Sequence, residues 1–414
     1  MTSRPLQAVL LPPSESGRLL AALAAALDGS GPAILPLDPA LPEASLARTI
    51  ETLAPSSLLT MTGTSALGAG PTGPSAPGVA DDTAVVIATS GSTGVPKGVE
   101  LSAAALTASA AASLRRIGAQ PGERWLCCLP TFHISGLGVL VRSLISGTDP
   151  VIGAKADPDV LAASGCAHVS LVPTQLRRLL DAGAKPAGFR TVLLGGAAAA
   201  GDLLPAAAAA GWPVVTTYGM SETCGGCVYD GRPLDGVDAV PGADGRIEIT
   251  GPVLFSGYRL QPELTAVALA GGRFRTADLG HFRADGRLVI RGRADDVINT
   301  GGEKVVAGEV EAALGTSPGV ADVVVIGVPD AEWGELVTAF VVPADPAEPP
   351  DLGQLRSIVR QTLSPRAAPR KVFVMPVFPL LPSGKPDRAA LRQVAQRDQD
   401  HIGPGGQWPD IGAQ

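Results

Sequence analysis

A buried strand that runs directly into a turn of glycines and hydroxyl side chains limits most strongly what this chain can fold into. Residues 84–88 (AVVIA) are all apolar, as in a strand that is covered on both faces. The turn that follows reads Thr89-Ser90-Gly91-Ser92-Thr93-Gly94-Val95-Pro96-Lys97-Gly98. Its glycines let the backbone approach an anion closely, and its hydroxyl and N–H groups can donate to phosphate oxygens. We therefore predict a phosphate-binding turn rather than a flexible surface turn.

The charge on Lys97 fits an anion site, yet the segment is not a Walker loop. Lys97 is followed by Gly98 instead of Ser or Thr, and the spacing of the glycines differs from the Walker pattern. The candidate nucleotide-binding residues of this turn are Thr89, Ser90, Gly91, Ser92, Thr93, Gly94 and Lys97.

The rest of the first 293 residues has the texture of layered α/β structure. Residues 21–27 predict a helix, 33–37 a strand, and 61–78, rich in Gly, Pro, Ser and Thr, a loop. Between residues 125 and 217, short apolar runs alternate with helical stretches rich in Ala and Leu. Residues 246–249 and 287–290 then alternate polar and apolar side chains, as half-buried antiparallel strands do.

The C-terminal region predicts a smaller α+β unit. Its expected elements are a helix at 308–314, strands at 321–328 and 336–342, a helix at 352–363 and a strand at 371–374. We place the domains at 1–293 and 294–395, followed by a Gly- and Pro-rich tail at 396–414.

Charge and composition narrow the partners and the compartment. The 414 residues carry a net charge of −7 without a run of Lys or Arg, so we expect no nucleic acid as partner. No window reaches the roughly 18 consecutive apolar residues of a spanning helix, and Pro12 and Pro13 interrupt the apolar start, unlike a signal peptide. We therefore expect a cytoplasmic protein without membrane insertion.

The five cysteines predict neither a disulfide framework nor a metal centre. Cys224 and Cys227 form a lone C-x-x-C, and a zinc site would need a second pair of ligands at suitable spacing. We interpret these two residues as structural or incidental.

Further segments along the chain, in a fixed order, resemble the motifs of the acyl-adenylate-forming superfamily, which comprises acyl-CoA synthetases, luciferases and peptide-synthetase adenylation domains. After the phosphate turn these segments are Gly195-Gly196-Ala197, Thr217-Tyr218-Gly219-Met220-Ser221-Glu222-Thr223, Thr276-Ala277-Asp278, Gly292-Arg293-Ala294-Asp295-Asp296, Gly301-Gly302-Glu303-Lys304 and Pro382-Ser383-Gly384-Lys385. Each segment alone is weak, and Asp278 or Lys304 by itself reads as an ordinary surface charge. Their number and order carry the resemblance.

The resemblance implies a role for each matching residue. The adenine-edge loop would be Gly195, Gly196 and Ala197, and the second nucleotide motif would be Thr217, Tyr218, Gly219, Met220 and Ser221. Tyr218 would stack on adenine, Glu222 would hold Mg²⁺, and Asp278 would accept the ribose hydroxyls. The family usually has Thr at the position of Ser221, which keeps the hydroxyl.

The C-terminal motifs imply a reaction in two steps. Lys385 would act in forming acyl-AMP from the acid and ATP, and Lys304 would act when coenzyme A takes the acyl group. Arg293 would lie near the phosphate or ribose, and Asp295 would be the hinge about which the C-terminal domain turns. The resemblance thus implies a large N-terminal domain of layered α/β subdomains plus a distorted antiparallel barrel, with a small mobile α+β C-terminal domain. ATP, Mg²⁺ and coenzyme A would be required.

The segment Phe132-His133-Ile134-Ser135-Gly136-Leu137, followed by Arg142, bears on the acid. Family members that activate amino acids have an aspartate where this chain has His133, and an unpaired ammonium in the pocket would be costly. The segment resembles the o-succinylbenzoate–CoA ligases of menaquinone biosynthesis, which are also compact before the phosphate turn. His133, Ser135 and Arg142 are therefore the candidate substrate residues.

Other readings stay open on the sequence alone. The chain can be a ligase for another aromatic or short-chain acid, a stand-alone enzyme that adenylates aryl acids, or a nucleotide-binding scaffold without turnover. The presence of Lys385, Glu222, Asp278 and Lys304 together argues against the scaffold. The short N-terminal region suggests that a partner subunit covers apolar surface, which predicts a homodimer.

Overall fold

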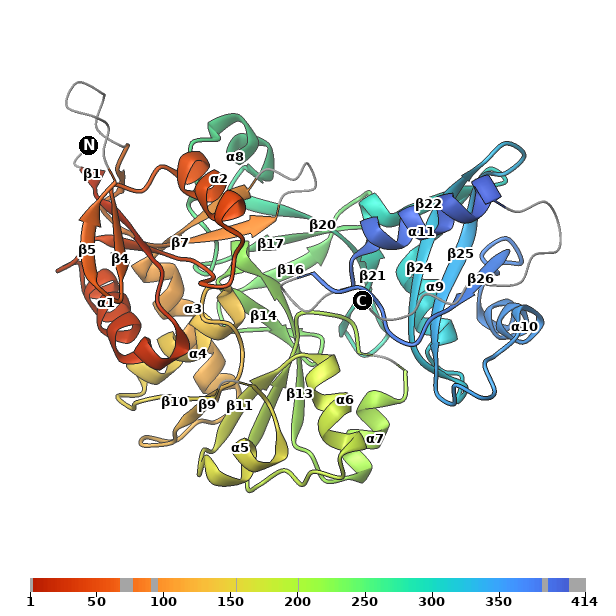
Figure 1. Cartoon of the computed structure of the whole chain (residues 1–414), viewed down its shortest axis with the longest axis horizontal. Helices are drawn as coiled ribbons and strands as arrows, with labels where there is room; N and C mark the ends of the chain where they lie inside the picture. Colours follow the sequence, from red (N-terminus) through yellow and green to blue (C-terminus); the bar gives the residue numbers. More distant parts are fainter. Residues whose placement is uncertain are drawn as a thin grey trace. The chain divides into compact units, whose positions relative to one another are not determined.

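Two structural units make up the described part of the chain. The computed structural model describes residues 3–67, 77–90, 96–153, 155–199, 201–381 and 386–401. The first unit contains residues 1–198 and 203–290, and the second contains residues 199–202 and 291–414 (Figure 1). Both units combine sheets with helices, which confirms the predicted α/β class.

The first unit contains two seven-stranded sheets. One has the strand order β18-β8-β7-β3-β2-β4-β5, with a parallel centre and antiparallel strands towards its edges. Its strands are β2 (Leu6–Val9), β3 (Ala33–Pro36), β4 (Ser57–Thr60), β5 (Gly63–Ala66), β7 (Thr83–Ser90), β8 (Pro96–Ser102) and β18 (Gly257–Tyr258). A two-residue pairing joins β1 (Ser3–Arg4) to β6 (Val79–Ala80). The predicted strands at 33–37 and 84–88 are confirmed as β3 and β7.

The predicted loop at 61–78 was wrong at its start. Strand β5 pairs with β4 as an antiparallel hairpin, with Leu58 opposite Ser65. Since β5 reads GTSA and lacks alternating apolar side chains, its pairing rests on backbone hydrogen bonds that leave no hydrophobic pattern in the sequence. Residues 68–76 lie outside the described residues.

The second sheet has the order β10-β9-β11-β12-β13-β14-β15. Strands β10 to β13 run parallel, and β14 and β15 are antiparallel. The strands are β9 (Trp125–Cys127), β10 (Val151–Ile152), β11 (His168–Leu171), β12 (Thr191–Leu194), β13 (Val214–Met220), β14 (Gly225–Tyr229) and β15 (Arg232–Pro233). Helices α4 (Ile134–Ile145), α5 (Pro158–Ala163), α6 (Pro173–Asp181) and α7 (Leu203–Ala209) alternate with them, which confirms the predicted α/β alternation.

A layer of helices lies between the two sheets. Helix α1 (Ser16–Asp28) contacts β3 and β7, α3 (Ala103–Arg116) contacts β8 and β14, and α4 contacts β9, β11 and β14. Helix α2 (Glu43–Leu53) lies on the other face of the first sheet, where it contacts β8. Helix α7 contacts β13 (Figure 1). The predicted helix at 21–27 is part of α1, which begins earlier, at Ser16.

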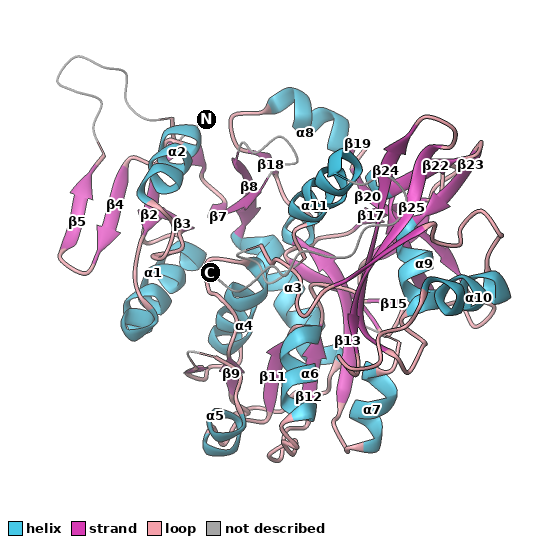
Figure 2. Ribbon diagram, turned by 45° about the vertical axis from the view of Figure 1, so that its right-hand side comes forward, coloured by secondary structure: helices cyan, strands magenta, loops and turns pink. Residues whose placement is uncertain are grey.

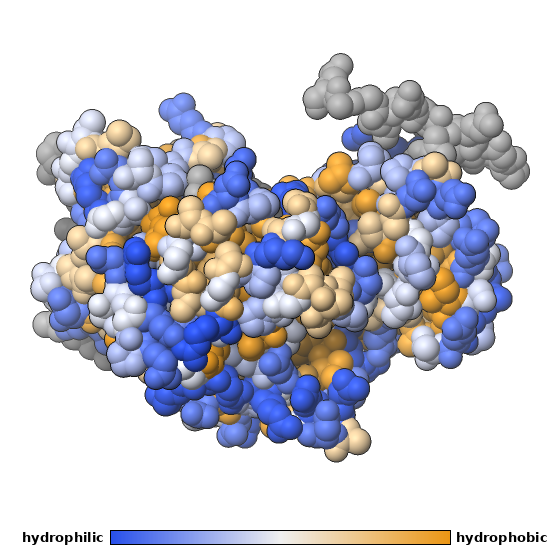
Figure 3. Space-filling view, turned by 90° about the horizontal axis from the view of Figure 1, so that it is seen from below, coloured by the Kyte–Doolittle hydropathy of each residue, from blue (hydrophilic) through white to orange (hydrophobic). Residues whose placement is uncertain are grey.

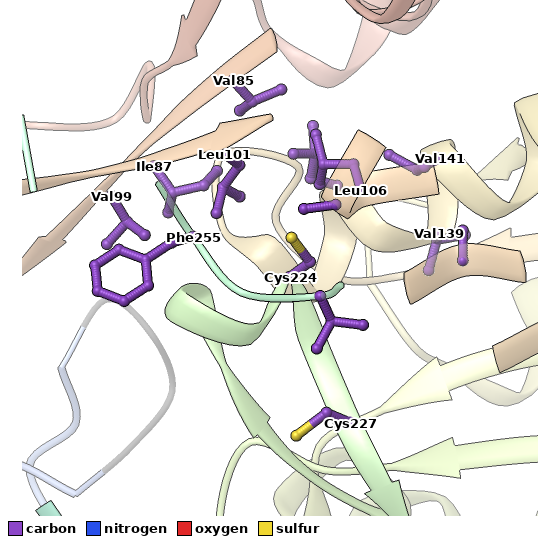
Figure 4. Close-up of a cluster of buried hydrophobic side chains, with 14 of the residues drawn as sticks. Val85, Ile87, Val99, Leu101, Leu106, Val139, Val141, Cys224, Cys227 and Phe255 are labelled. Atoms are coloured by element: carbon purple, nitrogen blue, oxygen red, sulfur yellow. The ribbon is translucent and has the colours of Figure 1, made fainter. Parts of the chain in front are cut away.

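The core of this layer is continuous with the edge of the candidate site. Figure 4 shows side chains from β7, β8, α3 and α4 converging with Phe255 and with two cysteines of the segment after β13. The labelled members are Val85, Ile87, Val99, Leu101, Leu106, Val139, Val141, Cys224, Cys227 and Phe255. Helix α3 adds polar anchors, because Ser109 donates to the Cys224 carbonyl at 3.2 Å and Ser113 lies 2.7 Å from the Tyr229 hydroxyl.

The antiparallel part of the first unit is an open sheet. Its order is β16-β17-β20-β19 with β21 also paired to β20, so the described strands form no closed barrel. The strands are β16 (Asp238–Pro241), β17 (Arg246–Thr250), β19 (Leu269–Ala270), β20 (Arg273–Phe282) and β21 (Leu288–Arg293), with α8 (Pro262–Ala268) before β19. The distorted barrel expected here is thus corrected to a sheet. Strands as short as β19 leave too few hydrogen bonds to close a barrel.

The second unit is one sheet covered on both faces. Its order is β23-β22-β25-β24 with β26 paired to β25. The elements are β22 (Val297–Thr300), β23 (Glu303–Val306), α9 (Ala307–Leu314), β24 (Val320–Asp330), β25 (Gly334–Pro343), α10 (Leu352–Thr362), β26 (Lys371–Val374) and α11 (Arg388–His401). Figure 2 shows α9 and α10 on one side of the sheet and α11 on the other. The five elements predicted from residue 308 onward are confirmed, whereas β22, β23 and α11 were not predicted.

Strand β24 shows why this sheet needs helices on both sides. Val323 and Val325 pack with the α9 and α10 side chains, and Val324 and Ile326 pack with those of α11. Because successive side chains point to opposite faces, a run of apolar residues is buried on both.

Hydrophilic residues cover much of the face that Figure 3 shows, with apolar residues scattered among them. Among the described helices, none is long and apolar enough to cross a bilayer.

We expect Arg259 to hold the first sheet together. This side chain is only 2% exposed and forms a 3.5 Å ion pair with Glu100. It donates to the backbone oxygens of Leu53, Ala54, Pro77 and Gly78. Arg259→Met should lower the free energy of unfolding by about 3–5 kcal/mol in urea titrations, since it leaves a half-buried carboxylate and several carbonyls unpaired.

The control is Arg287→Met, which removes a 3.5 Å pair with Asp285 between side chains that are each about half exposed. Its effect should stay within about 1 kcal/mol. Equal losses for the two variants would contradict the role of Arg259.

Candidate active site

The candidate residues of the first unit gather where its parallel strands end. The carboxyl ends of parallel strands lie at one edge of a sheet, which is the usual ligand edge of α/β folds. Strand β12 ends at Leu194 and is followed by Gly195, Gly196 and Ala197. The neighbouring strand β13 reaches Met220, so the adenine-edge loop and the second nucleotide motif lie side by side.

Gly195 is required by the close approach of these two segments. A Cβ at this position would overlap the Thr217 hydroxyl. That hydroxyl donates to the Leu194 carbonyl at 3.3 Å, which fixes Thr217 against the end of β12. The next residue, Gly196, has a φ of +85°, which L side chains rarely adopt.

A hydrogen bond joins Tyr218 to Asp278 across two sheets. The Tyr218 hydroxyl, at the end of β13, donates to Asp278 Oδ2 on β20 at 2.7 Å. Burial raises the pKa of Tyr218 above its usual value, and the negative charge of Asp278 raises it further. The phenol therefore stays protonated and remains a donor. The backbone N–H of Asp278 in turn donates to the Thr276 hydroxyl at 3.1 Å.

Ser221 and Glu222 lie in a single 3-10 turn after β13 (Ser221–Thr223). Thr223 fastens this turn, because its hydroxyl accepts from the Met220 N–H at 2.9 Å and lies 2.7 Å from the Gly225 carbonyl. Gly219 is also required, since a Cβ there would overlap the Gly225 carbonyl oxygen.

Tyr258 is a site residue that the sequence analysis missed. Its hydroxyl donates to Glu222 Oε1 at 2.9 Å, and the Lys97 ammonium lies 5.7 Å from the centroid of its ring. Burial raises the pKa of Tyr258, and the negative charge of Glu222 raises it further. One signal for it was the scarcity of tyrosine, with three in 414 residues, but its partner is brought near only by the pairing of β18 with β8.

The predicted phosphate turn is the connection of the β7–β8 hairpin. Thr89 pairs with Lys97, and its hydroxyl donates to the Lys97 carbonyl at 3.3 Å. Ser90 ends β7, whereas Gly91, Ser92, Thr93 and Gly94 lie outside the described residues. The structure therefore brings Lys97 towards Tyr258 and Glu222 without describing the tip of the turn.

The predicted substrate residues lie along helix α4. His133 occupies the N-cap position, with its ring 4.7 Å from that of Phe132, and Ser135 lies in the first turn. A Cβ at Gly136 would overlap the Pro130 carbonyl oxygen, so glycine lets the helix start tightly against the preceding segment. Arg142 lies two turns further along, half-buried, with Nη2 3.1 Å from the Ser170 hydroxyl.

The candidate residues of the second unit can be described only within that unit. Arg293 forms a bidentate pair with Asp295, with Nε–Oδ1 and Nη2–Oδ2 distances of 2.9 and 2.7 Å, between half-exposed side chains. Lys304 is exposed on β23 and pairs with Asn299 of β22. Gly301 and Gly302 connect these strands with φ values of +55° and +79°, as a two-residue hairpin turn requires. Lys385 lies outside the described residues.

All five cysteines are buried free thiols. Burial raises the pKa of Cys227 to about 12 and that of Cys127 to about 11, so these thiols stay protonated at neutral pH. No group of three or more potential metal ligands occurs among the described His, Cys, Asp and Glu side chains.

The close approach at Gly195 yields a test by compensation. Gly195→Ala should lower the free energy of unfolding by about 1–3 kcal/mol, because the new methyl overlaps the Thr217 hydroxyl. Adding Thr217→Ala should restore part of this loss. Gly17→Ala is the control, since it lies in α1 with open space around it and should stabilise by up to about 1 kcal/mol. The overlap would be refuted if the second substitution made Gly195→Ala worse.

Comparison with known protein families matches both units. Residues 64–259 match the model described as AMP-binding enzyme, and residues 309–385 match the AMP-binding enzyme C-terminal domain.

Curated relatives and solved structures agree with this match. A probable 2-succinylbenzoate–CoA ligase of Mycobacterium tuberculosis is 48% identical over 335 residues, covering 77% of this chain and 87% of the relative. The 2-succinylbenzoate–CoA ligase of Geobacillus kaustophilus is 33% identical over 347 residues, covering 77% and 71%. The o-succinylbenzoate CoA synthetase of Bacillus subtilis, in complex with its acyl-adenylate intermediate, superposes with a TM-score of 0.80 at 28% identity, covering 95% and 89%.

A second solved structure shows that this fold also serves another reaction. The amide bond synthetase of Marinactinospora thermotolerans superposes with a TM-score of 0.83 at 27% identity, covering 95% of this chain and 90% of that one. The family matches and the relative at 48% identity place the chain in one family. The chain belongs to the AMP-binding enzymes, the adenylate-forming family whose motifs its sequence carries in order.

Proposed function

We propose that this chain is an ATP-dependent o-succinylbenzoate–CoA ligase. It joins the acid to AMP with release of pyrophosphate, and then transfers the acyl group to coenzyme A with release of AMP. The observation that carries the proposal is the 48% identity over 335 residues to a probable 2-succinylbenzoate–CoA ligase. The structural likeness to the B. subtilis synthetase over 95% of the chain supports it.

The nucleotide is bound at the end of the second sheet. Gly195, Gly196 and Ala197 line the adenine edge, and the ring of Tyr218 stacks on the base. Asp278 accepts the ribose hydroxyls. The Tyr218–Asp278 hydrogen bond supports this assignment, because it holds the aromatic ring and the carboxylate in one place before the nucleotide arrives.

The triphosphate is held by the turn from Thr89 to Lys97 together with Thr217 and Ser221. Hydroxyl and N–H donors offset the repulsion that arises when a carboxylate and a triphosphate meet. Lys97 supplies a positive charge. Its ammonium lies beside the ring of Tyr258, and the hydroxyl of Tyr258 bonds Glu222, which supports a common site for Lys97 and Glu222.

The Glu222 carboxylate is a suitable ligand for Mg²⁺, which prefers carboxylate and phosphate oxygens. Of the side chains that the structure describes, Tyr258 bonds Oε1 of this carboxylate, so Oε2 can take a cation. When bound, the ion neutralises charge on the phosphates. The Tyr258 hydroxyl fixes the rotamer of Glu222, so the oxygen is presented without further ordering.

The acid lies near the start of α4. His133 and Ser135 donate to it directly or through water. Arg142 is the partner of the second carboxylate of o-succinylbenzoate, since among the described residues it forms no ion pair. A monoacid would leave this guanidinium without an anion, which favours a diacid as the substrate.

Lys385 and Lys304 serve different half-reactions. Removing Lys385 takes a positive charge from the phosphoryl-transfer step, so Lys385→Ala should slow acyl-AMP formation by about 10²–10³-fold. Thioester formation from supplied acyl-AMP should change little. The measurements are pyrophosphate release for the first step and single-turnover thioester formation for the second.

Lys304→Ala is the matched control and should do the reverse, sparing acyl-AMP formation and slowing thioester formation. If either variant slowed both steps equally, the division of roles between the two lysines would be wrong. A rotation of the C-terminal domain about Asp295, which would exchange Lys385 for Lys304, stays a prediction. The role of Arg293 near the phosphate or ribose also stays a prediction.

The substrate is tested by mass spectrometry of products from ATP, Mg²⁺, coenzyme A and a panel of acids. The panel contains o-succinylbenzoate, benzoate, a medium-chain fatty acid and an aromatic amino acid. A thioester from o-succinylbenzoate alone is expected. A thioester from another acid of the panel and none from o-succinylbenzoate would keep the ligase class and reject this substrate. Acyl-AMP without a thioester would indicate a stand-alone adenylating enzyme.

A cytoplasmic location and assembly as a homodimer stay predictions from the sequence. Size-exclusion chromatography with light scattering at several concentrations tests the second of these.

A further inference from the structure

Arg142 is surrounded by neutral groups. Its guanidinium carbon lies 4.3 Å from the centroid of the Trp125 ring, and Nη2 donates to the Ser170 hydroxyl at 3.1 Å. Nε is shielded from solvent and has no hydrogen-bond partner within the described ranges. Gly138, one turn earlier on α4, has only a hydrogen where a Cβ would lie 3.5 Å from Nη1. Burial lowers the pKa of Arg142 below its usual value.

The two buried arginines of the described chain, Arg4 and Arg259, have several acceptors each. Arg4 donates to the carbonyls of Ala25, Ala26, Gly31 and Thr83. Arg259 donates to four carbonyls and pairs with Glu100. Among the described residues, the contacts of Arg142 are one hydroxyl and one aromatic face, and no carboxylate pairs with it, so its charge is not neutralised there.

The side chains that contact the Arg142 guanidinium come from the paired parallel strands β9 and β11. The register sets His168 beside Trp125 and Ser170 beside Cys127, so all four side chains share the sheet face on which α4 packs. Trp125 and His168 are fully buried, with ring centroids 4.8 Å apart. The Trp125 ring is therefore fixed by its neighbours and presents a set surface to Arg142.

The far side of His168 is also held. Its Nε2 lies 3.1 Å from Glu123 Oε2, and Glu123 is paired with Arg190. Burial lowers the pKa of His168, so the imidazole is neutral at pH 7 and adds no charge beneath Arg142. Neutral partners can orient a guanidinium without cancelling its charge, which a carboxylate partner would do.

We propose that Trp125 and Ser170 are positioning residues that hold the Arg142 guanidinium ready for the second carboxylate of the diacid. Trp125 supplies the aromatic face, Ser170 fixes the end of the guanidinium, and the remaining N–H donors are directed at the ligand. This inference rests on the proposed function, because it assumes that Arg142 meets a substrate carboxylate.

The test compares two acids in steady-state kinetics of the full-length enzyme. The acids are o-succinylbenzoate and 4-oxo-4-phenylbutanoate, which keeps the aryl ketone and has a single carboxylate. Trp125→Leu should raise KM for the diacid about 3–30-fold, the range of a desolvated cation–π contact. Ser170→Ala should raise it about 3–10-fold, the range expected for loss of one ordinary hydrogen bond. KM for ATP and KM for the monoacid should stay within about two-fold of wild type, since neither depends on the guanidinium.

Trp212→Leu is the matched control, because Trp212 is also buried and its Nε1 also lacks a hydrogen-bond partner among the described residues. It should change neither acid's KM. Trp125→Phe keeps an aromatic face and should give an intermediate KM for the diacid, and it serves if Trp125→Leu does not fold. Equal losses for both acids in Trp125→Phe would overturn the positioning role and show a general packing effect.

A double-mutant cycle separates this proposal from the proposed function. With Arg142→Met in place, Trp125→Leu should add no further rise in KM for the diacid. If the wild type forms no thioester from o-succinylbenzoate, the proposed function fails. In that case the melting temperatures of wild type, Trp125→Leu, Arg142→Met and the double variant are compared without ligand. Additive shifts of the two single substitutions would overturn the positioning role, and non-additive shifts would support it.

Discussion

The fold of the first unit depends on one layer of helices that two sheets share. Helix α3 contacts strands of both sheets, and α4 packs against α3 and the second sheet, so their buried faces leave little room for polar side chains. The alanines of α3 meet this constraint by size, and its serines meet it by bonding Cys224 and Tyr229. A charge that is removed from water in this layer costs free energy unless an opposite charge or hydrogen bonds compensate it. Arg142 on α4 carries such a charge.

Tyrosine hydroxyl groups fix the orientation of two carboxylates in the candidate site. Tyr218 holds Asp278, and Tyr258 holds Glu222, each through one hydrogen bond below 3 Å. Both phenols have raised pKa values because they are buried, so they remain donors over the working pH range. Each carboxylate therefore accepts one hydrogen bond that fixes its direction.

The sequence was most informative where backbone conformation and close packing require one residue type. Gly195 and Gly219 lie where a Cβ would overlap a neighbour, so these motif glycines are needed for the fold itself. Gly301 and Gly302 form a hairpin turn, and the strands around it were missed because β22 and β23 are short and lack a clear alternation. Tyr258 was missed because its partner Glu222 is 36 residues away.

The sequence by itself determined the family, the order of the motifs and the α/β character of both units, because these depend on local residue types and short spacings. Only the tertiary structure decided which charges are satisfied. In the sequence, Arg4, Arg142 and Arg259 are three arginines with nothing to distinguish them. Strand register and helix packing provide Arg4 and Arg259 with carbonyl acceptors, whereas Arg142 contacts a tryptophan ring and a serine hydroxyl. Such partners are set by contacts between residues far apart in the chain, which no local pattern records.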